Sequence, residues 1–207
     1  MTLSGALRAA LEVASRELDV GLQDHLALRQ RRRIWAELGP PSEAESTPPF
    51  SIGRRRRGAL AILCGRYVLP IWEAACPNDR RPHDILQAAH LYLQHQGNEP
   101  TLRAMKGRLE THVDNLLSRT EHASDAYAAA SAARAASTAL HDETFGEGTG
   151  EEDTDVDLDP YQWDASFYAS MAVSKGAPWD KNTSGGRRRQ FWRWYLEQAV
   201  PESWENP

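Results

Sequence analysis

The chain has 207 residues, of which 41% are hydrophobic, and it contains seven tryptophans and carries a net charge of −5. This composition predicts a core large enough for one domain, and it excludes a globally disordered chain. The charge is uneven, because residues 142–159 hold nine acids and no lysine or arginine, whereas the rest of the chain holds 20 acids and 24 bases.

Apolar residues recur at helical spacing along the first half of the chain. The pattern predicts helices over about 2–19, 22–38 and 53–75. Residues 39–52 contain four prolines together with serine and threonine, and they are predicted to form a loop. Pro70 lies inside the third predicted helix, where the missing backbone N–H is expected to kink or interrupt it.

The second half continues the helical pattern, over about 82–96, 99–119 and 121–141. The last of these holds ten alanines between positions 123 and 139, which favours a central helix that its neighbours approach closely. Two further helices are predicted after the acidic stretch, over about 160–174 and 184–199. The final one carries Phe191, Trp192, Trp194 and Tyr195, so we expect a core-closing helix that Pro201 stops.

No segment shows the period-2 alternation of a strand. We therefore predict an all-α fold, a single domain over residues 1–207 built as a bundle of about eight helices. A proline-rich loop over 39–52 and an irregular acidic loop over 142–159 would interrupt it, the latter before the last two helices. The acidic loop contains little to bury, and its like charges oppose compaction.

The chain lacks a run of about 18 apolar residues and a signal-peptide pattern at its start, so no membrane segment or secretion is expected. If Cys64 and Cys76 lie on one helix, they are roughly 18 Å apart, too far for a disulfide. Reduced thiols are typical of a cytoplasmic protein, and that is the predicted location.

The acidic stretch is the candidate binding region. Its alternating acids, Asp153 to Asp159 with Asp164 at the twelfth position, resemble a calcium loop. Leu158, however, stands where a glycine is needed, and Asp164 stands where a glutamate is expected. A solvated acidic run and a docking surface for a basic protein are the other interpretations. The residues predicted to bind a partner are Glu151, Glu152, Asp153, Asp155, Asp157 and Asp159.

Arginines cluster at 29–33, 54–57 and 187–189, which raises the possibility of nucleic-acid binding. Four consecutive arginines spread around a helix rather than forming one basic face. Positive charge at a helix start is also mildly unfavourable, so pairing with acids within the fold is favoured over nucleic-acid binding. Phosphate-binding, dinucleotide, zinc and serine-hydrolase motifs are absent from the sequence, so we predict no catalytic residues, no metal site and no cofactor.

Several stretches occur in the order found in a known family. They are Tyr67–Glu73, Pro77–Asp84, His112–Leu116 with the alanine-rich segment after it, Gly176–Asp180 and Phe191–Trp204. In this ordered set the chain resembles predicted immunity proteins of bacterial polymorphic toxin systems. The resemblance implies an all-helical, non-enzymatic protein that neutralises a cognate toxin by direct contact, and it supplies no active-site residues. An enzyme with an unrecognised helical active site and a nucleic-acid-binding regulator that uses the arginine clusters remain the alternative functions.

Overall fold

The computed structural model describes residues 2–21, 24–40, 50–118, 123–142 and 154–207. Within these residues every regular element is helical and none is a strand, which confirms the all-α prediction. The elements are α1 (Gly5–Val20), α2 (Leu28–Glu37), α3 (Ile52–Ala75), α4 (Arg81–Leu93), α5 (Glu99–Leu117), α6 (Ala123–His141), the 3₁₀ turn η1 (Pro160–Gln162), α7 (Ala165–Ser174), α8 (Gly185–Trp194), the π turn η2 (Tyr195–Ala199) and α9 (Val200–Glu205).

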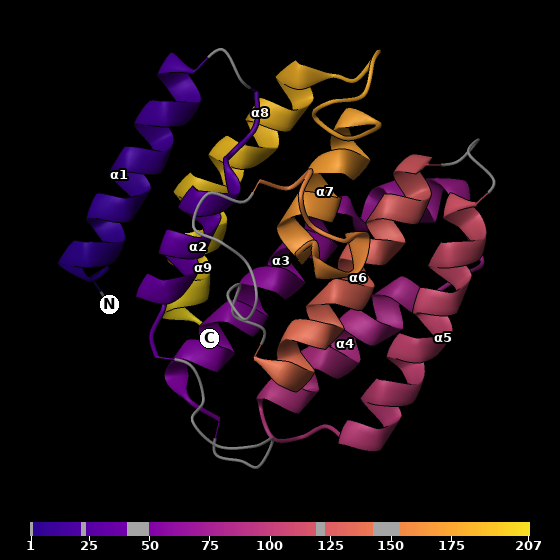
Figure 1. Cartoon of the computed structure of the whole chain (residues 1–207). Coiled ribbons are helices and arrows are strands. Elements are labelled where there is room, and N and C mark those ends of the chain that lie inside the picture. The colour runs from indigo at the N-terminus through magenta and orange to yellow at the C-terminus, as the bar shows by residue number, and fades with distance from the viewer. Residues whose placement is uncertain (1, 22–23, 41–49, 119–122, 143–153) are drawn as a thin grey trace.

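Helices α3 and α6 form the centre of the bundle. Helix α6 packs against α3, α4, α5 and α7, as the alanine-rich sequence predicted. A small residue also allows a close contact between α3 and α4: a Cβ atom added at Gly65 of α3 would lie only 2.7 Å from Leu86 Cδ2 on α4. In Figure 1, α1 and α8 lie on one side of the bundle and α5 lies on the opposite side.

Helix α3 is continuous from Ile52 to Ala75, with Pro70 inside it. Of the two expected effects of Pro70, a kink or an interruption, the interruption does not occur. Pro70 and Arg66 are both exposed, so the carbonyl of Arg66, which loses its helical partner, can bond to water instead. By length and composition alone α3 could cross a membrane. In the bundle, however, α4, α6, α7 and α9 pack against it.

Helix α2 begins at Leu28, six residues later than its apolar pattern predicted. The residues just before it are held by side chains of other segments and of α2 itself instead of by helical bonds. Asp24 pairs with Arg188, His25 bonds to Asp155, and the carbonyl of Leu26 accepts a bond from Arg31. These contacts fix the segment in a non-helical path that local periodicity does not encode.

The C-terminal aromatic helix closes the core, as predicted. Trp192 and Tyr195 are fully buried, and the indole N–H of Trp35 donates to the Tyr195 hydroxyl at 2.9 Å. Trp194 is half-buried against Tyr67, with ring centroids 4.3 Å apart.

The prediction that Pro201 stops this helix is wrong, because α9 continues to Glu205. The π turn η2 inserts a wider turn just before the proline. The proline ring then falls in the first turn of α9, where a backbone N–H is not required.

Candidate partner-binding surface and buried charge network

The described carboxylates of the acidic stretch differ in their exposure to solvent. Glu151, Glu152 and Asp153 lie outside the described residues. Asp157 and Asp159 are exposed, whereas Asp155 is only 4% exposed. Asp155 was expected on a solvated docking surface, and this expectation is corrected because its side chain points into the bundle. The exposed acids remain candidates for contact with a partner.

Asp155 belongs to a buried charge network centred on Arg31, a fully buried residue of α2. The guanidinium donates to both carboxylate oxygens of Asp155, to Asp164 Oδ2 at 3.1 Å and to the Leu26 carbonyl at 2.8 Å. Burial alone would raise the pKa of Asp155, but the charge of Arg31 and hydrogen bonds from His25 and Arg31 hold that pKa well below its usual range. The network therefore anchors the point where the acidic stretch re-enters the bundle.

The second carboxylate of this network, Asp164, begins α7. Its Oδ1 accepts the backbone N–H groups of Ser166 at 2.8 Å and Phe167 at 3.1 Å, so it caps the helix. Asp155 and Asp164 were two positions of the possible calcium loop. Their oxygens are used by an arginine and by a helix start, which gives both side chains structural roles.

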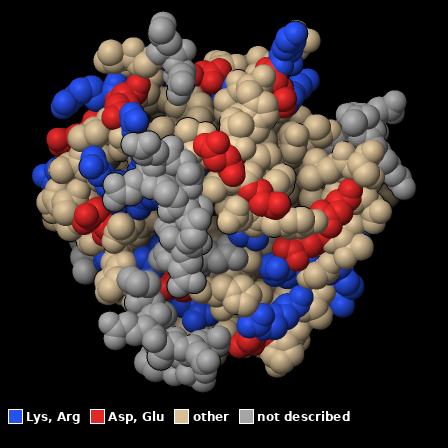
Figure 2. Space-filling model, viewed as in Figure 1, with Lys and Arg blue, Asp and Glu red and all other residues tan. Residues whose placement is uncertain are grey.

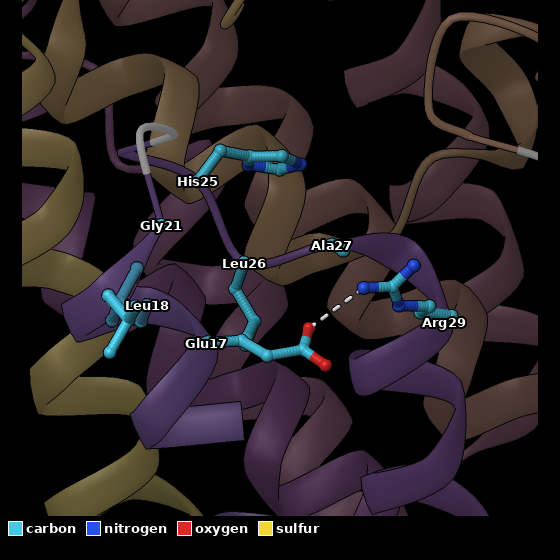
Figure 3. A pocket seen from close by; sticks show the side chains of 8 residues that line it. Glu17, Leu18, Gly21, His25, Leu26, Ala27 and Arg29 are labelled. Carbon is cyan, nitrogen blue, oxygen red and sulfur yellow. Dashed lines mark hydrogen bonds and ion pairs between the residues drawn. The ribbon is translucent and has the colours of Figure 1, made fainter. Parts of the chain in front are cut away.

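His25 connects the network to a surface pocket of about 470 Å³ between the end of α1 and the segment that leads into α2 (Figure 3). Its Nε2 lies 2.9 Å from Asp155 Oδ2 and donates to it, while the buried Nδ1 has no hydrogen-bond partner among the described residues. Burial lowers the pKa of His25, so the ring is neutral.

The remaining polar groups of the pocket are few. Glu17 and Arg29 form an exposed ion pair at 3.0 Å across its mouth, and Leu18 and Leu26 supply apolar surface (Figure 3). Within this described lining, no nucleophile lies beside a base as in hydrolytic sites. A neutral imidazole and one ion pair give the pocket little chemistry beyond packing.

The arginine clusters do not form a basic face, because several of their side chains are buried. Arg57 pairs with Asp142 at 2.8 Å and donates to the Gly39 carbonyl at 2.6 Å. Arg54 donates to the last carbonyls of α6, Ala139 and Leu140, at 2.8 Å each. Charged groups placed inside the fold cannot neutralise phosphates, so these contacts argue against nucleic-acid binding by this cluster.

The third cluster behaves in the same way. Arg188, 1% exposed, pairs with Asp24 at 2.9 Å and donates to the Gly176 carbonyl at 3.0 Å. The predicted pairing of this cluster with acids elsewhere in the fold is confirmed for Arg188.

Apolar side chains are exposed beside the outward-facing acids, a feature that the sequence interpretation missed. Val156 is 64% exposed and Tyr161 is 61% exposed, and they flank Asp157 and Asp159 along the chain. Figure 2 shows acidic side chains gathered on the face that carries α7 and the segment before it. An aromatic residue next to Pro160, in a stretch of mostly polar residues, could have identified this surface from sequence.

Comparison with known proteins gives one family. A family model described as immunity protein Imm5 matches residues 11–202 of the chain. A search of curated proteins finds no match.

Proposed function

The chain belongs to the Imm5 immunity protein family, and we propose that it protects its producer by binding a cognate toxin directly and blocking it. The observation that carries this proposal is the family match, which spans almost the whole described fold. Membership of an immunity family implies a toxin as partner. We place the pair in a bacterial polymorphic toxin system, with the immunity protein in the cytoplasm, where the toxin would otherwise act.

Several features support binding rather than catalysis. Two buried arginines are engaged in contacts that hold the fold: Arg31 with Asp155 and Asp164, and Arg57 with Asp142. The pocket beside His25 lacks the paired groups of a hydrolytic site in its described lining. A helical bundle that presents a charged surface is suited to occluding another protein.

The surface we propose for the toxin is formed by acids of the acidic stretch. Opposite charges speed the encounter of two proteins and favour the correct orientation, so a basic toxin would be the natural partner. The proposed residues are Glu151, Glu152, Asp153, Asp157 and Asp159, of which the first three lie outside the described residues. Asp155 supports this surface from below through its contacts with Arg31 and His25.

The test begins with the toxin encoded beside the gene. Co-expression of the chain should restore growth of cells that make this toxin. The purified chain and a catalytically inactive toxin should then form a stable complex in isothermal titration calorimetry. Growth rescue without any complex would contradict direct binding and would favour an enzyme that reverses the toxin's damage.

A further inference from the structure

A small groove lies where η1 crosses the surface formed by α5 and α6. Its volume is about 220 Å³, and its floor is made by the buried residues Val113, Ala130 and Ala133. Pockets for small-molecule ligands have volumes of roughly 300–1,000 Å³. The groove is therefore too small for a cofactor or drug-sized ligand, and it matches a single side chain of a partner protein.

The rim of the groove presents a fixed aromatic ring. Tyr161 belongs to η1, which is closed by a capping box between Asp159 and Gln162 and is held down by the Tyr168 hydroxyl, which donates to the Pro160 carbonyl at 2.8 Å. The Tyr161 hydroxyl donates to Asp114 Oδ2 at 3.0 Å. An aromatic ring fixed in this way loses little conformational entropy when a partner covers it.

The rim is also negatively charged. Asp114 is exposed, and within the described part of the chain its carboxylate accepts from Tyr161 and pairs with no lysine or arginine. Glu110 lies one turn earlier on α5 and forms an ion pair with Lys106 at 2.8 Å. Arg134 on α6 also lines the groove and offsets part of this charge.

The negative charge at the rim affects the titration of the Tyr161 phenol. Its pKa is raised by the hydrogen bond to Asp114 and by the charges of Asp114, Asp159 and Glu110. A cation that approaches the ring from solvent meets the same three carboxylates. The groove thus combines an apolar floor, an exposed aromatic face and an acidic edge.

We propose that this groove receives an arginine side chain of the toxin, a step that rests on the direct binding proposed above. The methylene groups of the arginine lie on Val113 and Ala130, its planar guanidinium stacks on the ring of Tyr161, and its N–H groups pair with the carboxylate of Asp114. Arginine suits this geometry better than lysine, because a guanidinium stacks on aromatic faces and bonds carboxylates through two parallel N–H groups. Aromatic and arginine residues seated in pockets also dominate the energy of many protein interfaces.

The experiment measures toxin affinity for Tyr161→Ala and Asp114→Asn by calorimetry, with the inactive toxin as titrant. Each substitution is expected to weaken binding at least tenfold, as a central interface contact does. Val20→Ala and Asp19→Asn are matched controls, since Val20 is 82% exposed and Asp19 forms an exposed pair with Arg193 on the opposite side of the bundle. Thermal unfolding of each variant verifies that the fold is retained.

The partner's side is tested by changing each surface arginine of the toxin to lysine in combination with Asp114→Asn. One arginine should show a coupling of at least tenfold in a double-mutant cycle. If Tyr161→Ala and Asp114→Asn both bind as tightly as the wild type, the groove proposal is overturned while direct binding stands. If both weaken binding and no toxin arginine couples to Asp114, the assignment of arginine is overturned. If the wild-type chain forms no complex, the proposed function and the groove proposal both fail.

Discussion

Replacing Arg31 by methionine tests the claim that a buried charge network anchors the acidic stretch. Methionine keeps much of the side-chain volume but removes the guanidinium donors to Asp155 and Asp164, which are 4% and 3% exposed. Asp164 retains its backbone N–H donors, whereas Asp155 retains only His25 among the described side chains. The loss of Arg31 therefore leaves a buried carboxylate largely uncompensated.

Removing one partner of a buried ion pair typically costs about 3–5 kcal/mol. For a domain of this size each kcal/mol lowers Tm by roughly 2–4 °C, so Arg31→Met should lower Tm by roughly 6–20 °C. Denaturant unfolding followed by circular dichroism measures the free energy. The matched control is Arg29→Met on the same helix, whose exposed pair with Glu17 should contribute less than about 1 kcal/mol.

A double variant tests whether the uncompensated charge of Asp155 causes the loss of stability. Adding Asp155→Asn to Arg31→Met removes the uncompensated charge, so the double variant should be less unstable than the sum of the two single variants. A cost below about 1 kcal/mol for Arg31→Met, equal to that of Arg29→Met, would refute the reasoning, because it would mean that these carboxylates do not depend on the arginine.

Three further predictions concern the core, the pH dependence and the acidic surface. Trp192→Ala should destabilise the fold by about 3–5 kcal/mol and Trp194→Ala by less, because Trp194 is half-buried; equal losses in denaturant unfolding would contradict this. Burial lowers the pKa of His25, so below pH about 6.5 the unfolded chain binds a proton that the folded chain does not, and wild-type stability should fall with acid. His25→Gln should reduce the dependence of the unfolding free energy on pH by up to about 1.4 kcal/mol per pH unit. Identical pH profiles of stability for the variant and the wild type would exclude a buried neutral imidazole. Changing Glu151, Glu152, Asp153 and Asp157 of the proposed surface to amides should slow toxin association, flatten its salt dependence and leave folding intact. An unchanged association rate at two salt concentrations would remove the support for acidic docking.

The helices could be predicted from sequence because their apolar spacing is a local property. Their ends could not be predicted where distant residues decide them. Asp24 and His25 are not helical, because they bind partners on α8 and on the segment before η1. Pro201 is accommodated by a π turn, which no residue pattern in the sequence predicts. The common physical reason is that tertiary contacts outweigh weak local preferences at these positions.

The candidate surface was located by its charge, but its individual acids could not be told apart. Asp155 and Asp157 are two residues apart in the same composition, yet Asp155 is buried and Asp157 is exposed. The difference comes from Arg31, which is 124 positions away in the chain. The arginine clusters were expected to pair with acids within the fold. The burial of Arg54 depends instead on backbone carbonyls near the end of α6, to which it donates, and the sequence pattern did not predict these contacts.

The most direct test of the central claim is a titration of toxin activity at fixed toxin concentration, well above the dissociation constant, with increasing amounts of the purified chain. A protein that neutralises its toxin by occlusion should abolish activity at one equivalent, with inhibition proportional to the amount added below that point. Complete protection at a small fraction of an equivalent, increasing with time, would contradict direct binding and would identify the chain as an enzyme.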